Sequence, residues 1–318
     1  MTPACSVIIR AYNEEKHIGR LLTGIFQQTL HDVEIILVDS GSTDGTVSIA
    51  AQYPVKVVSI PPAEFTFGRS LNRGIEQAQA EWLVFASAHV YPVYPDWLER
   101  LLEPLGNAQV ALTYGKQRGG ETTKFSEHEI FRHWFPDQAQ PYQDHPFCNN
   151  ANAAIRRSLW EQHAYDELLP GLEDLSWARW AFEQGYRVVY IPEAEVIHLH
   201  QETPRGVYNR YRREGMAFKQ IYPQEHFRLL DLVRLFTSNA LSDLRSAAHQ
   251  HRFSASWRSI FWFRWMQFLG TYRGYQQSGP LTWQLKQAFY YPRQTSIASA
   301  PNDRKVLPIQ YRDPPDCG

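Results

Sequence analysis

Short apolar runs alternate with helical repeats over the first third of the chain. Aliphatic and β-branched residues fill 5–9, 33–38, 55–60, 82–86 and 110–114. Between these runs, 14–28, 43–52, 70–78 and 96–105 place apolar side chains three or four positions apart, as amphipathic helices do. The strand segments are apolar on both faces, which is typical of parallel sheets covered on both sides. The pattern predicts an α/β fold, a mostly parallel central sheet with helices on both faces.

The pattern weakens after the fifth predicted strand. Residues 119–147 are polar and aromatic with little periodicity, and we expect a mobile loop or lid there. Regular structure is predicted again over 149–160, in a helix over 174–184, and in strands over 187–191 and 195–198. Residues 205–293 contain 14 Lys and Arg against 4 Asp and Glu, and predict a basic, aromatic helical extension. The last part, with four prolines, predicts an extended tail. We therefore expect three regions, 1–204, 205–293 and 294–318.

Composition excludes several classes of protein. With 318 residues, of which 43% are hydrophobic, the chain can bury a core, which excludes wholesale disorder. The net charge of −1 argues against a globally basic nucleic-acid binder. The three cysteines lie far apart and fit neither a disulfide framework nor a zinc motif. No signal-peptide pattern and no apolar run of membrane-spanning length is found, so we expect a cytoplasmic protein.

Polar residues follow the predicted strands where ligands bind in such sheets, at the carboxyl ends. Tyr12 and Asn13 follow the first strand, Asp39 ends the second, and 87–89 end the fourth. A carboxylate at this edge can accept the N–H groups of a pyrimidine or of guanine. The alternative is that Asp39 only caps a turn.

Two of these segments together carry a family resemblance. Residues 9–15 have the sequence IRAYNEE, and residues 38–46 have the sequence VDSGSTDGT. The chain resembles the family-2 glycosyltransferases with the GT-A fold, and the likeness extends through SLNRG at 70–74 and GLED at 171–174, covering about 4–200. The resemblance implies transfer of a sugar, with inversion, from a nucleotide-diphosphate donor to a saccharide or lipid-linked hydroxyl acceptor. It also suggests a rhamnosyl-type reaction in surface-polysaccharide or glycolipid assembly.

The resemblance assigns donor-binding roles. Tyr12 would pack on the base, Asp39 would bind its N3–H, and Glu14 or Ser42 would lie near the ribose or base. The full set of donor residues that we expect is Tyr12, Asn13, Glu14, Asp39, Ser42, Ser87, His89 and Arg73.

Residues 87–89 depart from the family pattern. They have the sequence Ser-Ala-His where the family carries Asp-x-Asp, whose carboxylates hold a divalent metal, Mn²⁺ or Mg²⁺, on the donor diphosphate. His89 could be the surviving ligand. His198 and His200 point to the same side of a strand, and His198 better matches a later metal ligand of the family. Imidazole suits Mn²⁺ or Zn²⁺ better than Mg²⁺.

A site without metal is the alternative. His89 would then hydrogen-bond a phosphate, and arginines such as Arg69, Arg73 or Arg118 would neutralise the diphosphate. The loss of Asp-x-Asp also leaves open a nucleotide-sugar-binding scaffold without transfer activity. A dinucleotide oxidoreductase is disfavoured because no Gly-x-Gly-x-x-Gly follows the first strand.

Glu173 and Asp174 begin a predicted helix. Inverting transfer needs a base for the proton of the attacking hydroxyl, and the resemblance gives that role to Asp174, with Glu173 beside it. The alternative is two acids placed favourably at a helix start. Gln117, Asn150 and Trp177 are candidates for sugar or acceptor contacts, although asparagines also form turns. A processive Gln-x-x-x-Trp motif is missing, so one transfer per encounter is expected.

Residues 256–269, SWRSIFWFRWMQFL, are apolar nearly all round and contain two arginines. Three interpretations are open: a helix packed against the catalytic domain, a helix on an anionic membrane surface at the inner face, or a homodimer contact. No nucleic-acid module surrounds the segment, so RNA is not an expected partner.

Overall fold

The computed structural model describes residues 2–139, 143–200, 203–276 and 306–311. Its centre is one sheet in the order β3-β2-β1-β4-β7-β6-β8-β5. The strands are β1 (Cys5–Ala11), β2 (Val33–Asp39), β3 (Lys56–Ser59), β4 (Trp82–Ser87), β5 (Val90–Pro92), β6 (Val110–Arg118), β7 (Asn152–Arg156) and β8 (Arg187–His198).

The sheet is mostly parallel, with two strands that run in the opposite direction. The half built from β1 to β4 is parallel, and β6 runs parallel to β8. By contrast, β7 runs antiparallel to both of its neighbours, and the edge strand β5 runs antiparallel to β8. The predicted α/β class and the mostly parallel sheet are therefore confirmed, and β5 and β7 are the antiparallel exceptions.

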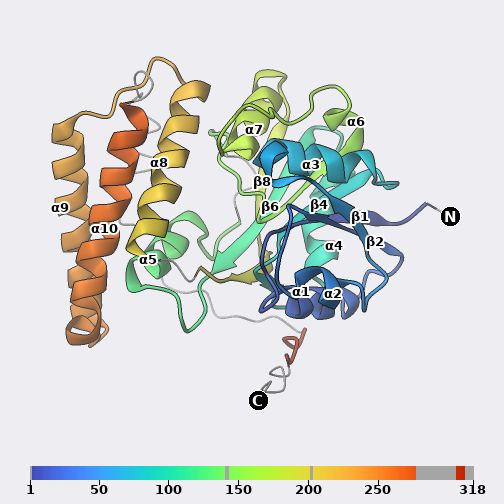
Figure 1. Ribbon diagram of the computed structural model, residues 1–318, viewed down its shortest axis with the longest axis horizontal. Helices are drawn as coiled ribbons and strands as arrows, with labels where there is room; N and C mark the ends of the chain where they lie inside the picture. Colours follow the sequence, from blue (N-terminus) through green and yellow to red (C-terminus); the bar gives the residue numbers. More distant parts are fainter. Residues whose placement is uncertain (1, 140–142, 201–202, 277–305, 312–318) are drawn as a thin grey trace.

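Helices cover both faces of the sheet, as the apolar strands predict (Figure 1). One face carries α1 (Ile18–Phe26), α2 (Thr46–Ala50) and α4 (Trp97–Leu102). The other carries α3 (Phe67–Glu76), α6 (Arg157–Trp160) and α7 (Glu173–Glu183). Alternate residues of β1 supply the two layers, since Val7 and Ile9 pack on the first face and Ile8 on the second.

Three long helices form the C-terminal part: α8 (Pro204–Ile221), α9 (Leu229–His249) and α10 (Phe253–Tyr275). In Figure 1, α8 lies nearest the sheet and α9 lies outermost. A Cβ added to Gly270 would lie 2.5 Å from the Tyr208 carbonyl oxygen, and one added to Gly274 would lie 2.3 Å from that of Arg212. The backbones of α8 and α10 therefore touch, and only glycine fits at these two positions.

The helix α10 also contacts the catalytic part through α5 (Phe125–Trp134). The buried guanidinium of Arg264 donates to the Asp243 carboxylate of α9 at 2.7 Å and lies against the Ser126 carbonyl. One side of the 256–269 segment is thus packed inside the molecule, as the first interpretation has it, while Trp257, Phe261 and Trp265 remain exposed.

Two local predictions are corrected by the structure, and one short strand was missed. The 119–147 region is not all loop, because it contains α5. The buried face of this helix includes the polar residues Ser126 and Glu127, so the sequence lacks the apolar repeat by which an amphipathic helix is recognised. The strands expected at 187–191 and 195–198 are one strand, β8, with an irregularity in its pairing to β6 near Gly115. The short strand β5 was not predicted.

The C-terminal tail is only partly described. Residues 294–305 and 312–318 lie outside the described residues. Within 306–311, the Ile309 N–H donates to the Val93 carbonyl, and the Tyr311 hydroxyl donates to the Pro92 carbonyl, so this segment lies along the end of β5. Among the residues that the structure describes, no helix has the length and hydropathy that a membrane span requires.

Candidate active site

The ends of β1 and β2 lie side by side. The strand register pairs Ala11 with Asp39, so Tyr12 and Asp39 converge as the sequence predicts. Two bonds tie the following loops together: the Asn13 side-chain oxygen accepts from the Thr43 N–H at 2.8 Å, and the Ser42 hydroxyl accepts from the Asn13 N–H at 2.9 Å. Asn13 and Ser42 thus hold each other, and Asn13 adopts a left-handed φ of 55° that asparagine tolerates.

A cavity of about 460 Å³ opens beside these strand ends. We call it the first cavity. It collects four predicted donor residues, Tyr12, Glu14, Ser87 and His89, and its wall also contains Arg10, Ala11, Ser40, Pro62, Phe65 and Phe67. Tyr12 lies at its rim and is 57% exposed, which leaves the ring face available for stacking.

Asp39 lies below this wall and is buried. Its carboxylate accepts from the amides of Gly41 and Ser42, at 3.0 and 3.1 Å. It is therefore fixed by its own turn, as the capping alternative describes, next to the Ser40 that lines the cavity.

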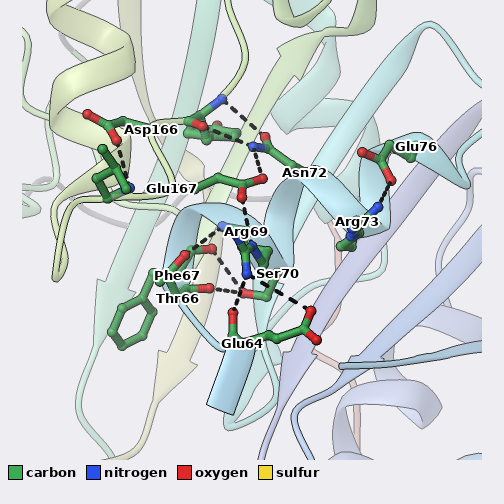
Figure 2. A network of polar contacts seen from close by, with 12 residues as sticks. Glu64, Thr66, Phe67, Arg69, Ser70, Asn72, Arg73, Glu76, Asp166 and Glu167 are labelled. Carbon is green, nitrogen blue, oxygen red and sulfur yellow. Dashed lines mark hydrogen bonds and ion pairs between the residues drawn. The ribbon is translucent and has the colours of Figure 1, made fainter. Parts of the chain in front are cut away.

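Arg73 does not reach the first cavity. Figure 2 shows it on α3, paired with Glu76 at 3.0 Å on the solvent side. Its neighbours Arg69 and Asn72 instead hold Glu167, at 2.7 and 3.0 Å. This network anchors the segment that leads into α7.

A second cavity, of about 180 Å³, lies between the sheet and the C-terminal helices. The sheet side contributes Gln117, His198 and His200, and the start of α7 contributes Asp174. The opposite wall comes from α5, α8 and α10, with residues that include Glu127, Arg210, Tyr211, Glu214, Gln267 and Thr271.

Asp174 is half-buried at the wall of the second cavity. Its carboxylate accepts from the Asn150 N–H at 3.0 Å and from the Leu175 N–H at 2.8 Å. Burial and the neighbouring Glu173 raise the pKa of Asp174 to about 7, against the opposing effect of these bonds and of Arg10. Arg10 itself pairs with Glu173 at 2.8 Å. Asp174 can therefore take up a proton near neutral pH, whereas Glu173 is held as the partner of an arginine.

Three histidines from the walls of the two cavities lie close together. One ring nitrogen from each of His89, His198 and His200 lies within 4.8 Å of the others. The Nδ1 atom of each ring contacts an oxygen, with distances of 2.7, 2.7 and 2.8 Å to Glu14, Gln117 and Glu127, respectively. Since these oxygens accept, the Nδ1 atoms of His89 and His198 donate to them, which leaves their Nε2 atoms for another partner. The Nδ1 atom of His200 also lies 3.0 Å from the guanidinium of Arg210, which can only donate. Such oxygen partners orient histidine ligands in metal sites.

Electrostatics disfavours the charged forms of His198 and His200. Burial and the neighbouring rings lower the pKa of His198 well below its ordinary value. Burial and Arg210 lower that of His200 to about 4. Although burial alone would raise it, Arg210 and His200 lower the pKa of Glu127 to about 2. Within the described residues, the buried His198 Nε2 has no hydrogen-bond partner, so the donor set fits a bound cation.

The remaining predicted residues differ in position. Gln117 lines the second cavity, and Asn150 contributes its backbone N–H to Asp174. Trp177 is in the core, and its indole donates to the His163 carbonyl at 2.7 Å. Arg118 pairs with Glu195 at 2.7 Å.

Sequence analysis did not single out four residues of the site: Arg10, Glu127, Arg210 and Glu214. Glu127 lies in the predicted loop and Glu214 in the extension, so only the tertiary structure brings them to Asp174. Arg10 is the exception. A charged residue near the carboxyl end of an apolar strand is visible in the sequence and could have been predicted as a site residue.

Comparison with known proteins agrees with this geometry. Residues 6–163 match the family described as "Glycosyl transferase family 2". The O-antigen chain rhamnosyltransferase WbaN of Salmonella anatum is 28% identical over 67% of this chain and 72% of its own. RfbN of Salmonella typhimurium, of the same description, is 26% identical over 66% and 71%.

Solved structures share the fold. The mannosyltransferase PcManGT of Pyrobaculum calidifontis, in complex with GDP-Man and Mn²⁺, gives a TM-score of 0.59 at 19% identity, over 85% of this chain and 86% of that one. Residues 1–349 of TarS from S. aureus give 0.51 at 16% identity, over 86% and 91%. The strand-end motifs, the sheet and these relatives together show that the chain belongs to the family-2 glycosyltransferases and has the GT-A fold.

Proposed function

We propose that this glycosyltransferase moves a sugar from a nucleotide-diphosphate donor to a hydroxyl acceptor with inversion. One observation carries the proposal: Asp174, a half-buried carboxyl with a pKa near neutrality, lines a cavity whose histidines lie beside His89 of the first cavity. The named rhamnosyltransferases among its relatives favour a deoxyhexose as the sugar and an O-antigen-type glycan as the product.

The two cavities suit the two substrates. The nucleotide would lie in the first cavity, its base against Tyr12 and its ribose near Glu14. The acceptor hydroxyl would enter from the second cavity, where Asp174 accepts its proton as the oxygen attacks the anomeric carbon. A bond forms between that oxygen and the anomeric carbon, the bond to the diphosphate breaks, and the diphosphate leaves with the electron pair. A single displacement inverts the anomeric centre.

A divalent cation fits the histidine cluster. His89 and His198, with His200 as a third ligand, would hold it through ring nitrogens that lie within 4.8 Å of one another. Such a cation would supply positive charge to the leaving diphosphate. Imidazole ligands favour Mn²⁺ or Zn²⁺ over Mg²⁺.

Calorimetric titration with Mn²⁺ and with Zn²⁺ tests the metal site. We expect His89→Ala to weaken binding about 10- to 100-fold, the usual cost of a lost ligand or its support. His163→Ala, a histidine stacked on Trp180 outside the cluster, is the matched control. Unchanged affinity in His89→Ala rejects the site.

Donor turnover tests the function. We expect the wild type to transfer or hydrolyse one of a panel of thymidine-, guanosine- and uridine-diphosphate sugars, and Asp174→Asn to do so about 10²- to 10⁴-fold more slowly. Product anomeric configuration, measured by NMR, tests inversion. Nucleotide binding with equal, negligible turnover by both proteins would instead favour the scaffold alternative.

We also infer that an apolar surface on α9 and α10 contacts an anionic membrane. The exposed residues that define this outer face are Leu229, Leu230, Val233 and Leu241 of α9 and Trp257, Phe261 and Trp265 of α10. Phe236 joins the two helices there, with ring centroids 5.2 Å from Phe261 and 5.3 Å from Trp265. Aromatic and aliphatic side chains flanked by arginines are typical of proteins that lie in the membrane interface.

Charge favours lipid over a second copy of the chain. Residues 204–276 contain 12 Lys and Arg against 4 Asp and Glu, so two such faces repel each other, whereas anionic lipid attracts each. A lipid-linked acceptor would be presented at the same surface.

Flotation with vesicles of phosphatidylcholine and phosphatidylglycerol tests this contact. The wild type should float with mixed vesicles and less with pure phosphatidylcholine, and Phe261→Ser with Trp265→Ser should remain at the bottom. Phe26→Ser, an exposed phenylalanine on α1, should float as the wild type does. The proposed membrane contact is wrong if the double variant floats as well as the wild type does. It is also wrong if the wild type forms a stable dimer and does not float.

A further inference from the structure

The second cavity is built by two parts of the chain that differ in character. The glycosyltransferase core supplies aromatic rings, among them Phe131, Trp134 and Phe147. The C-terminal helices supply polar groups, namely Tyr211 and Glu214 from α8 and Gln267 and Thr271 from α10. Apolar ring faces opposite a few polar groups are the usual lining of a small-molecule site.

Carboxyl groups dominate the charge of this cavity. Glu127, Asp174 and Glu214 all line it, and the cation on the same wall is Arg210. Arg210 is committed to Glu127, to which it donates at 2.8 Å. Burial raises the pKa of Glu214 above its ordinary value although Arg210 and Arg213 oppose the shift. Arg210 and Arg213 thus do not fully compensate the cost of burying a negative charge on Glu214.

The wall also contains a donor without an acceptor. In the part of the chain that the structure describes, the buried Gln117 Nε2 makes no hydrogen bond, while its Oε1 is engaged with His198. A ligand that both donates and accepts would satisfy this amide and the Glu214 carboxylate together, and adjacent sugar hydroxyls do both. An acidic ligand would instead lie among three carboxyl groups, and Arg210, the cation of the described lining, is already paired with Glu127.

We propose that Glu214 recognises the acceptor in the second cavity, accepting hydrogen bonds from hydroxyls of a neutral sugar, and that it excludes acidic sugars. The C-terminal helices then determine acceptor choice, while the core carries the transfer chemistry. This inference rests on the proposed function, because it takes Asp174 to be the base that the acceptor approaches.

The experiment uses matched pairs of octyl glycosides. Within each pair, in the gluco, galacto and manno series, the two compounds differ only in a hydroxymethyl or a carboxylate at C6. Equilibrium binding to the full chain is measured by calorimetry, with transfer measured alongside. We expect the wild type to bind the best neutral glycoside at least about 10-fold more tightly than its acidic partner. This ratio is a difference of about 1.4 kcal/mol in binding free energy.

Variants of Glu214 assign the effect. Glu214→Gln should weaken the neutral glycoside about 10-fold, as the loss of one hydrogen bond to a charged group does, and should bring the neutral-to-acidic ratio close to one. Glu214→Asp keeps the charge and should keep the ratio. Glu183→Gln, at the exposed end of α7, is the matched control and should leave both unchanged.

Three results overturn the proposal: equal binding of a neutral glycoside and its acidic partner by the wild type, no binding of any neutral glycoside, or an unchanged ratio in Glu214→Gln. Nucleotide binding, measured on the same samples, separates this failure from that of the proposed function. A protein that binds nucleotide and turns over a donor but fails the glycoside test retains its function and loses only this assignment.

Discussion

At the residue scale, Asp174 combines the chemical role proposed for it with an energetic cost. Desolvation and the adjacent Glu173 disfavour the charged form of its half-buried carboxyl, and two backbone N–H groups offset that penalty only in part. A base must be ionised to act, and a pKa near the working pH is the best compromise between availability and strength.

The rate of transfer should therefore rise with pH through about pH 7, as Asp174 loses its proton. The measurement is kcat/KM for donor and acceptor across the pH range at constant ionic strength. A rate that is flat from about pH 5 to pH 8 would show that another group accepts the proton.

The same burial predicts that Asp174→Asn stabilises the fold. Because the folded pKa lies above the ordinary value of 3.8, the unfolded chain releases this proton first, and stability falls as pH rises from there to about 7. Removing the charge should raise Tm by a few degrees, more at about pH 8 than at about pH 5. Asp32→Asn, at an exposed turn, is the control for thermal unfolding. If the Tm of Asp174→Asn at the higher pH equals or falls below that of the wild type, the prediction is wrong.

How much of the site the sequence could predict depends on the range of each contact. Tyr12 and Asp39 were predictable because parallel strands end at one edge of a sheet. Glu214 was not, because it reaches Asp174 only through the packing of α8 on the core. Nothing in the sequence distinguished Arg73 from the arginine of a surface ion pair, or Trp177 from an ordinary core residue.

At the scale of elements, the contact between α8 and α10 depends on two glycines. A side chain at Gly270 or Gly274 would meet a carbonyl oxygen of α8 closer than van der Waals contact allows. Backbone cannot yield as a flexible side chain can, so the helices would have to separate. The wall of the second cavity formed by Glu214 and Gln267 would move with them.

Gly270→Val and Gly274→Val should therefore destabilise the protein by about 1–3 kcal/mol or more, the range for overpacking a close contact. Urea unfolding gives the free energy, and glycoside binding reports the cavity. Gly106→Ala is the control, since a Cβ there has no neighbour within 4 Å. A free energy of unfolding equal to that of the wild type would show that the helices are not tightly apposed.

The Arg264–Asp243 pair joins α9 to α10 in the interior. Arg264→Met leaves Asp243 buried without its cation and should cost about 3–5 kcal/mol. Adding Asp243→Leu should recover most of that loss, because the stranded charge is removed. Calorimetric unfolding of the single and double variants provides the measurement, and a double variant as unstable as the single one would assign the effect to packing instead.

At the scale of the whole molecule, the helical part and the sheet are joined through a polar network. Arg210 of α8 donates to Glu127 of α5 at 2.8 Å, and Glu127 in turn contacts His200 at the end of β8. The hydrophobic pattern predicted the sheet region and the helical extension. It could not predict the network between them, because its residues are far apart in the chain. Because the network is buried, breaking it should uncouple the two parts.

We expect the wild type to unfold in one transition, with fluorescence and far-UV circular dichroism coincident. Arg210→Met should separate the two signals, since the helical part loses its buried link to the sheet. Arg205→Met, on an exposed turn of the same helix, should leave them coincident. Coincident signals in Arg210→Met would show that apolar packing alone couples the parts.

The histidine cluster belongs to the walls of both cavities, because His89 lines the first cavity while His198 and His200 line the second. Under the proposed function, the donor and the acceptor would therefore depend on one set of three side chains. A single substitution in this cluster should then alter the affinity for both substrates at once.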